Sequence, residues 1–151
     1  RDNGGVEDGG KDRTEQRPFI IRVVHVNLAP SFTLPQPDAL AVEGGGLTHI
    51  VGFASDILRG DDSEAGQGLF FNLSYASSTP GLFVVAPSVD EAGTLTLAAA
   101  PDKHGIAYCT LTLRDTGGTE QGGRDVNEEG PIPFRILVLP RPRVTNVHPA
   151  L

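Results

Sequence analysis

The residues of this chain that could do chemistry are few, and several of them share one acidic loop. Asp61, Asp62 and Glu64 lie close together, and carboxylate oxygens are the ligands that a hard cation such as Ca²⁺ prefers. We expect no cofactor, with calcium at these three residues as the open alternative, because a run of charges more often forms a solvated surface. Arg59, Gly60 and Asp61 also match a tripeptide that some cell-surface receptors recognise on exposed loops.

Two further positions have defined chemistry. Asn72-Leu73-Ser74 has the acceptor pattern for N-glycosylation, and the alternation of residues 69–75 places Asn72 on the outward face of a strand. We therefore predict Asn72 as a glycosylation site. Cys109 is the only cysteine, so an intradomain disulfide is excluded, and its apolar neighbours predict that it faces the core.

No set of residues supports catalysis. The histidines have no second ligand two or four positions away, as a zinc site would need, and no serine lies in a nucleophile elbow. The glycine pairs lack the strand, turn and helix that surround a phosphate-binding loop. We predict that the protein is not an enzyme.

Length and composition limit what can position these residues. The chain has 151 residues, enough for one domain, and its 19 glycines and 12 prolines favour an all-β fold with many turns. A net charge of −7 argues against nucleic-acid binding, and no apolar run approaches the ~20 residues that a membrane span needs. The acidic loop around Asp61 and the basic stretch from Arg135 to Arg143 predict a polarity of charge along the molecule.

Alternation of apolar and polar residues predicts the strands of an antiparallel β-sandwich. The period of two is clearest at 106–113, where Cys109 and every second residue share one face. No stretch has the spacing of an amphipathic helix, and Asp56-Ile57-Leu58 is expected to form no more than a short turn. The predicted strands are residues 49–53, 69–75, 82–85, 94–97, 106–113 and 134–139.

An internal repeat sets the organisation of the chain. Residues 1–17 align without a gap on residues 114–130, with nine identities, and the pattern that opens at Asn27 returns at Asn146. The repeating unit is therefore 119 residues long. We predict that 1–26 are the terminal strands of a preceding repeat or an N-terminal arm, that 27–145 form a complete sandwich, and that 146–151 begin another repeat or a linker.

The apolar segment 18–26 is then a strand separated from the other strands of its own module, so it needs a host sheet to pair with. We predict that Phe19, Ile21 and Val23 form an inter-module strand. Its host is either the preceding module of the same polypeptide, which we favour because 146–151 stop just as a repeat begins, or a neighbouring copy joined by β-augmentation. Both versions predict a linear, head-to-tail array.

Several motifs in order give the unit a family resemblance. It resembles the Ig-like or cadherin-like tandem repeats of large extracellular adhesins and cell-surface filaments of bacteria, algae and protists. The residues that carry this resemblance are the Asn-x-x-Pro-x-Phe pattern at 27–32, Glu64 to Gln67, Gly93 to Thr96, Ala100 to Asp102, and Gly105 to Asp115 leading into Gly117 to Thr119.

The resemblance implies an extracellular Ig-like sandwich with a structural or adhesive role. Its implied partners are neighbouring copies or repeats, and cell-surface glycans or receptors, without nucleic acid or membrane insertion. The alternative function is a calcium-dependent or carbohydrate-binding surface module. The family often holds calcium through an acidic residue in the linker, but Leu28 and Val147 stand at those positions here, which counts against calcium at the junctions.

Overall fold

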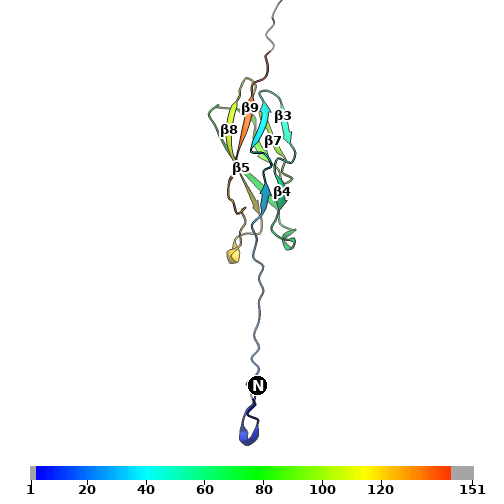
Figure 1. Ribbon diagram of the computed structural model, residues 1–151, viewed down its shortest axis with the longest axis vertical. Helices are drawn as coiled ribbons and strands as arrows, with labels where there is room; N and C mark the ends of the chain where they lie inside the picture. The colour runs from blue at the N-terminus through cyan, green and yellow to red at the C-terminus, as the bar shows by residue number, and fades with distance from the viewer. Residues whose placement is uncertain (1–2, 144–151) are drawn as a thin grey trace, which may run out of the picture.

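The computed structural model describes residues 3–143, which are almost entirely β-structure (Figure 1). The expected start of another repeat at 146–151 lies outside the described residues. Three one-turn 3₁₀ helices lie in loops: η1 (Glu7–Gly9), η2 (Asp62–Glu64) and η3 (Glu120–Gly122). The described strands are β1 (Ser31–Thr33), β2 (Asp38–Val42), β3 (Leu47–Ile50), β4 (Ser55–Leu58), β5 (Leu69–Ser77), β6 (Phe83–Val89), β7 (Leu95–Ala99), β8 (Gly105–Asp115) and β9 (Ile132–Leu139).

Two sheets form the layers of the sandwich. One has the strand order β2-β9-β8-β5 and the other β3-β7-β6, while β1 and β4 pair separately as a two-stranded ribbon. All described pairings are antiparallel except β2 with β9, which run parallel from the Asp38–Arg135 pair to the Val42–Leu139 pair. The edge strand β6 contains Pro87 and pairs irregularly with β7, with two shifts of register.

The core lies between the two sheets and is made of the residues that alternation places inward. Leu95 and Leu97 of β7 are fully buried, and they belong to the same cluster as Leu111 and Ile136 from the opposite sheet. Two aromatic contacts belong to this cluster: Phe53 meets Phe134 at a centroid distance of 4.9 Å, and Phe32 meets Phe71 at 5.1 Å. The all-β sandwich predicted from the sequence is therefore confirmed.

The predicted strands agree with the structure except near residue 50. The structure places β5 to β9 over the five later segments, and the inward residues predicted for β7, β8 and β9 are buried. The segment predicted at 49–53 is instead β3 at 47–50, because the chain turns at Val51 and Gly52, where Gly52 has a φ of +70°. Phe53 reaches the core from beyond this turn.

Three strands were not predicted, and one of them replaces an expected turn. Asp56-Ile57-Leu58 belongs to β4, so the turn prediction is wrong. The sequence Ser-Asp-Ile-Leu shows no alternation of apolar and polar residues there, although half-buried and exposed residues alternate in the structure. Strands β1 and β2 each have only one or two buried residues, so no pattern of useful length marks them.

Cys109 lies on the inward face of β8, as predicted, and is 3% exposed. Burial raises the pKa of its thiol to about 11. Since the thiolate is the reactive form, we expect native protein to react with an aromatic disulfide reagent at least about 100-fold more slowly than the same protein in denaturant. Absorbance of the released thiolate measures both rates, and nearly equal rates would contradict the burial.

Residues 1–26 are called the arm, and its described part, residues 3–26, leaves the sandwich along its long axis, with residues 18–26 extended (Figure 1). No described strand pairs with the arm, and its apolar side chains are open to solvent, with Phe19 81%, Ile21 76% and Val23 91% exposed. The arm therefore does not fold back into the sandwich that follows it.

Candidate functional site

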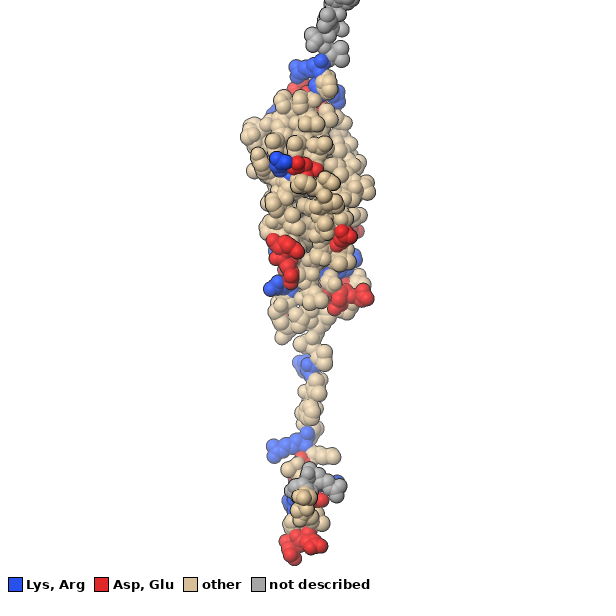
Figure 2. All heavy atoms as spheres, in the orientation of Figure 1, with Lys and Arg blue, Asp and Glu red and all other residues tan. Residues whose placement is uncertain are grey.

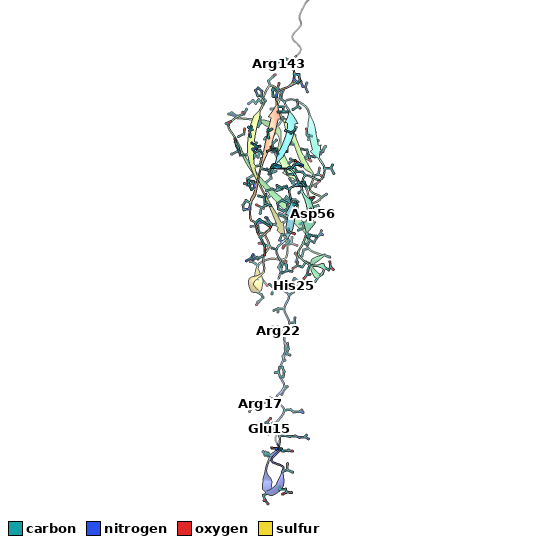
Figure 3. All side chains as sticks on the ribbon, in the orientation of Figure 1. Glu15, Arg17, Arg22, His25, Asp56 and Arg143 are labelled. Atoms are coloured by element: carbon teal, nitrogen blue, oxygen red, sulfur yellow. The ribbon has the colours of Figure 1, made fainter. Side chains whose placement is uncertain are left out.

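The site with the densest polar contacts lies where the arm enters the sandwich. Figure 3 shows His25 at the base of the sandwich, below it Arg22, Arg17 and Glu15 along the arm, and Arg143 at the opposite end. We call the contacts of residues 25–28 the entry site and those of residues 139–143 the exit site.

Asn27 is the centre of the entry site and is 5% exposed. Its Nδ2 donates to Asp115 Oδ1 at 2.8 Å, to the Arg124 carbonyl at 2.7 Å and to the Gly118 carbonyl at 3.2 Å. Its Oδ1 accepts from Gln67 Nε2 at 2.8 Å, and its backbone carbonyl accepts from Arg124 N–H at 3.0 Å. Three acceptors around one nitrogen fix the orientation of this amide.

Two glycines make room for the Asn27 side chain. A Cβ on Gly117 would lie 2.0 Å from Asn27 Oδ1 and 2.5 Å from Gln67 Nε2. A Cβ on Gly123 would lie 3.0 Å from the Asn27 Cβ. The loop between β8 and β9 is therefore shaped around this one amide.

Glu64 holds the next residue of the entering chain. Its side chain is fully buried, and its carboxylate accepts from Leu28 N–H at 2.8 Å and from Asp61 N–H at 3.1 Å. Asp61 caps η2 in return, which completes a capping box. His25 Nε2 lies 3.4 Å from Glu64 Oε1 and 3.2 Å from Ser63 Oγ.

The exit site repeats this arrangement with different residues. Glu43 is 5% exposed and accepts a backbone hydrogen bond from Arg141, while His104 Nδ1 lies 3.2 Å from its Oε2. Arg141 Nη2 also donates to the Gly44 carbonyl at 2.8 Å, and Arg143 Nη2 lies 3.3 Å from Asp102 Oδ1. A buried glutamate thus holds a backbone N–H of the chain at each end of the sandwich.

Glu43 gives the exit site a dependence on pH. The Arg141 backbone hydrogen bond first, and then His104, hold the pKa of Glu43 below its ordinary value of 4.5. A lowered folded-state pKa stabilises the fold above the ordinary value and loses that contribution as pH falls through the lowered one. We expect Glu43→Gln to be less stable than wild type at neutral pH and the gap to close below pH 4.5.

Urea unfolding at a series of pH values measures that gap. Glu91→Gln, at an exposed turn position, is the matched control and should follow wild type throughout. A gap between wild type and Glu43→Gln that stays constant across the series would contradict the assignment.

Charge is distributed unevenly over the visible face. Figure 2 shows basic side chains at the exit end and most of the acidic ones in the half of the sandwich nearer the arm, while much of the surface between carries neither. This agrees with the charge polarity predicted from the sequence.

The predicted acidic loop has a different role from the one expected. Glu64 points inward to backbone N–H groups, and Asp61 accepts from Ser63 N–H at 2.7 Å. The Ser63 hydroxyl, which donates to Asp61 Oδ1 at 2.5 Å, and then the Ser63 N–H hold the pKa of Asp61 below its ordinary value. Within residues 3–143 no three His, Cys, Asp or Glu side chains gather in a way that could hold a metal ion. Calcium at Asp61, Asp62 and Glu64 stays the alternative that the sequence left open.

The Arg59-Gly60-Asp61 tripeptide lies between β4 and η2. Arg59 Nε donates to the Gln67 carbonyl at 2.7 Å, and Asp61 caps η2. Both charged side chains are therefore engaged within their own loop. Recognition of this tripeptide by a receptor stays a prediction.

Asn72 lies on the outward face of β5, the edge strand of its sheet, and is exposed as the sequence predicted. The two tyrosines do not form a common site, because Tyr75 pairs with Cys109 and Tyr108 with Ala76, which places the two rings on opposite faces. A sugar could therefore not stack on both at once.

The arm begins with a second copy of the loop that surrounds Asn27. Gly5 and Gly118 have φ values of +76° and +77°, and Asp8 and Gln121 share left-handed conformations at +54° and +57°. The closing bond from Gly10 N–H to the Glu7 carbonyl is 3.0 Å, and its counterpart in the loop at 120–123 is 2.9 Å. The aligned sequences therefore also share a local backbone structure.

Sequence reasoning missed the roles of Asn27 and Glu64. Asn27 was noticed only as the start of the repeat. Its signal was the recurrence, in residues 1–17, of the aspartate and glycines that contact it. Asp61-x-x-Glu64 matches the spacing of a capping box, which would have directed both carboxylates to the backbone rather than to a cation.

Comparisons with known proteins identify no relative of this chain. No protein-family model, curated protein or solved structure matches the chain. No helix among residues 3–143 is long and apolar enough to cross a membrane.

Proposed function

We propose that this chain is an Ig-like module of an extracellular tandem-repeat protein, with a structural or adhesive role in a linear, head-to-tail array. The observation that carries the proposal is the arm, which repeats both the sequence and the backbone conformation of the loop around Asn27. A loop of this kind belongs at the end of a module, so a second copy in front of the sandwich is what a preceding module would leave there.

The strand that follows the copied loop supports the same proposal. Phe19, Ile21 and Val23 correspond to Phe134, Ile136 and Val138 of β9, so both segments read Phe-x-Ile-x-Val. In β9 these three side chains are at most 3% exposed. The arm therefore carries the inward face of a central sheet strand, and neighbouring repeats or copies are its natural partners.

The positions of entry and exit favour an array over a compact cluster. The chain enters at one end of the long axis and leaves at the other (Figure 1), and buried Glu64 and Glu43 hold it at the two ends. Modules joined in this way extend along one axis, which gives reach and stiffness to a surface protein.

Electron microscopy of a chain with three consecutive 119-residue units tests the array. We expect a straight rod that lengthens by an equal step for each added unit. A flexible coil, or compact particles without a common axis, would contradict the proposal. Native material should show the same string or fibre.

Glycosylation at Asn72 is a separate test of the extracellular assignment. The side chain is exposed on an edge strand, so a glycan there has a neighbouring strand, β8, on one side only. Secretion from a eukaryotic host should add a glycan mass that an N-glycanase removes, and Ser74→Ala, which destroys the acceptor pattern, should abolish it. Secreted protein with the unmodified mass would contradict the prediction.

A further inference from the structure

We propose that the hydrogen bonds of the Asn27 side chain transmit tension from the entering chain to β5, β8 and the loop 115–124. Residues 27–37 then stay on the sandwich under load. We call this set of hydrogen bonds the catch. The inference rests on the proposed function, because a module in a linear array is pulled at both ends. The catch is a property of the single module, however, and is tested on it alone.

The elements just behind Asn27 are weakly paired to the rest of the fold. β1 has three residues and only two bridged pairs with β4, Ser31 with Leu58 and Thr33 with Ser55. The ribbon β1–β4 lies outside both larger sheets. The next firm pairing begins at Asp38, where β2 joins β9. If no contact before β1 held the chain, tension would therefore act first on the β1–β4 pair, the weakest strand pair of the sandwich.

Asn27 is well placed to supply that hold. One side chain makes four hydrogen bonds, to Gln67 just before β5, to Asp115 at the end of β8, and to the loop carbonyls of Gly118 and Arg124. Because the four bonds start from one amide, they are loaded together instead of in succession. The Leu28 N–H bond to buried Glu64 adds a fifth within one residue.

The repeat itself points to the same residues. Four positions that surround Asn27 recur in the arm, since Asp115, Gly117, Gly118 and Gly123 align with Asp2, Gly4, Gly5 and Gly10. A Cβ on Gly117 would overlap with Asn27, and a Cβ on Gly123 would make a tight contact with it at 3.0 Å. Four of the nine identities are therefore positions that surround Asn27, as expected if each module has its own catch.

The test is single-molecule pulling of the full chain by its two ends, with Asn27→Ala against wild type. We expect wild type to unfold in one step. The variant should first lengthen at lower force by no more than about 40 Å, the extended length of the eleven residues 27–37, and should then unfold as the remaining sandwich does.

Two control variants make the result decisive. Val89→Ala creates a cavity at a buried position of β6 whose side chain takes no part in the entry-site hydrogen bonds, so it lowers stability while leaving those bonds in place. Asn72→Ala removes an exposed asparagine. If Asn27→Ala shows the early step and neither control does, the catch is established. If its traces match those of Val89→Ala, with one step at reduced force, the catch is overturned, whatever microscopy shows for the array.

Discussion

Asn27→Asp should destabilise the sandwich by about 3–5 kcal/mol, the usual cost of an uncompensated buried charge. The substitution puts an oxygen where Nδ2 now donates to Asp115 Oδ1 and to the carbonyls of Gly118 and Arg124. Three hydrogen bonds are lost, and a second carboxylate faces Asp115 at hydrogen-bond distance. Urea unfolding at neutral pH measures the change in the free energy of unfolding.

Asn72→Asp is the matched control, because it makes the same chemical change at an exposed position. It should change the free energy of unfolding by less than about 0.5 kcal/mol. Similar values for the two aspartate variants would show that the amide of Asn27 is not seated as described.

Gly117→Ala should cost about 1–3 kcal/mol through overpacking. Its methyl group would lie 2.0 Å from Asn27 Oδ1 and 2.5 Å from Gln67 Nε2, so the side chain must leave its seat or the loop must move. The free energy of unfolding from urea melts measures this cost. The positive φ that often explains a glycine is not the reason here, because Gly117 is not among the residues with that conformation.

A double-mutant cycle separates the contact from a general loss of loop stability. In an Asn27→Ala background the extra methyl meets a smaller neighbour, so we expect Gly117→Ala to cost clearly less than in wild type. Gly66→Ala, with open space and no positive φ, should be close to neutral. Equal costs of Gly117→Ala in both backgrounds would contradict the steric argument.

The sandwich could be predicted because its long strands alternate cleanly. Buried Cys109 and Leu111 of β8 are separated by the half-exposed Thr110, which follows the period of two. β4 could not be predicted in this way, since its residues Ser-Asp-Ile-Leu do not alternate in polarity and the strand is paired with three residues from a distant part of the chain. Short ribbons depend on tertiary partners more than on their own pattern.

The entry site could be predicted only in part. The repeat marked the segment before Asn27 as the end of a module, but hydrogen bonds that span 88 to 97 positions, such as Asn27 to Asp115 and to Arg124, leave no local signal. Glu64 was misjudged for a related reason. In the sequence, a carboxylate within an acidic run is expected to be solvated. Whether it is instead buried and bound to the backbone N–H of another segment depends on the tertiary fold.

The irregular edge strand β6 has a consequence for how many such molecules can crowd together. Pro87 has no N–H to offer, and the two shifts of register disturb the straight edge that a foreign strand would need. Sideways stacking into amyloid-like bundles is therefore discouraged along this edge.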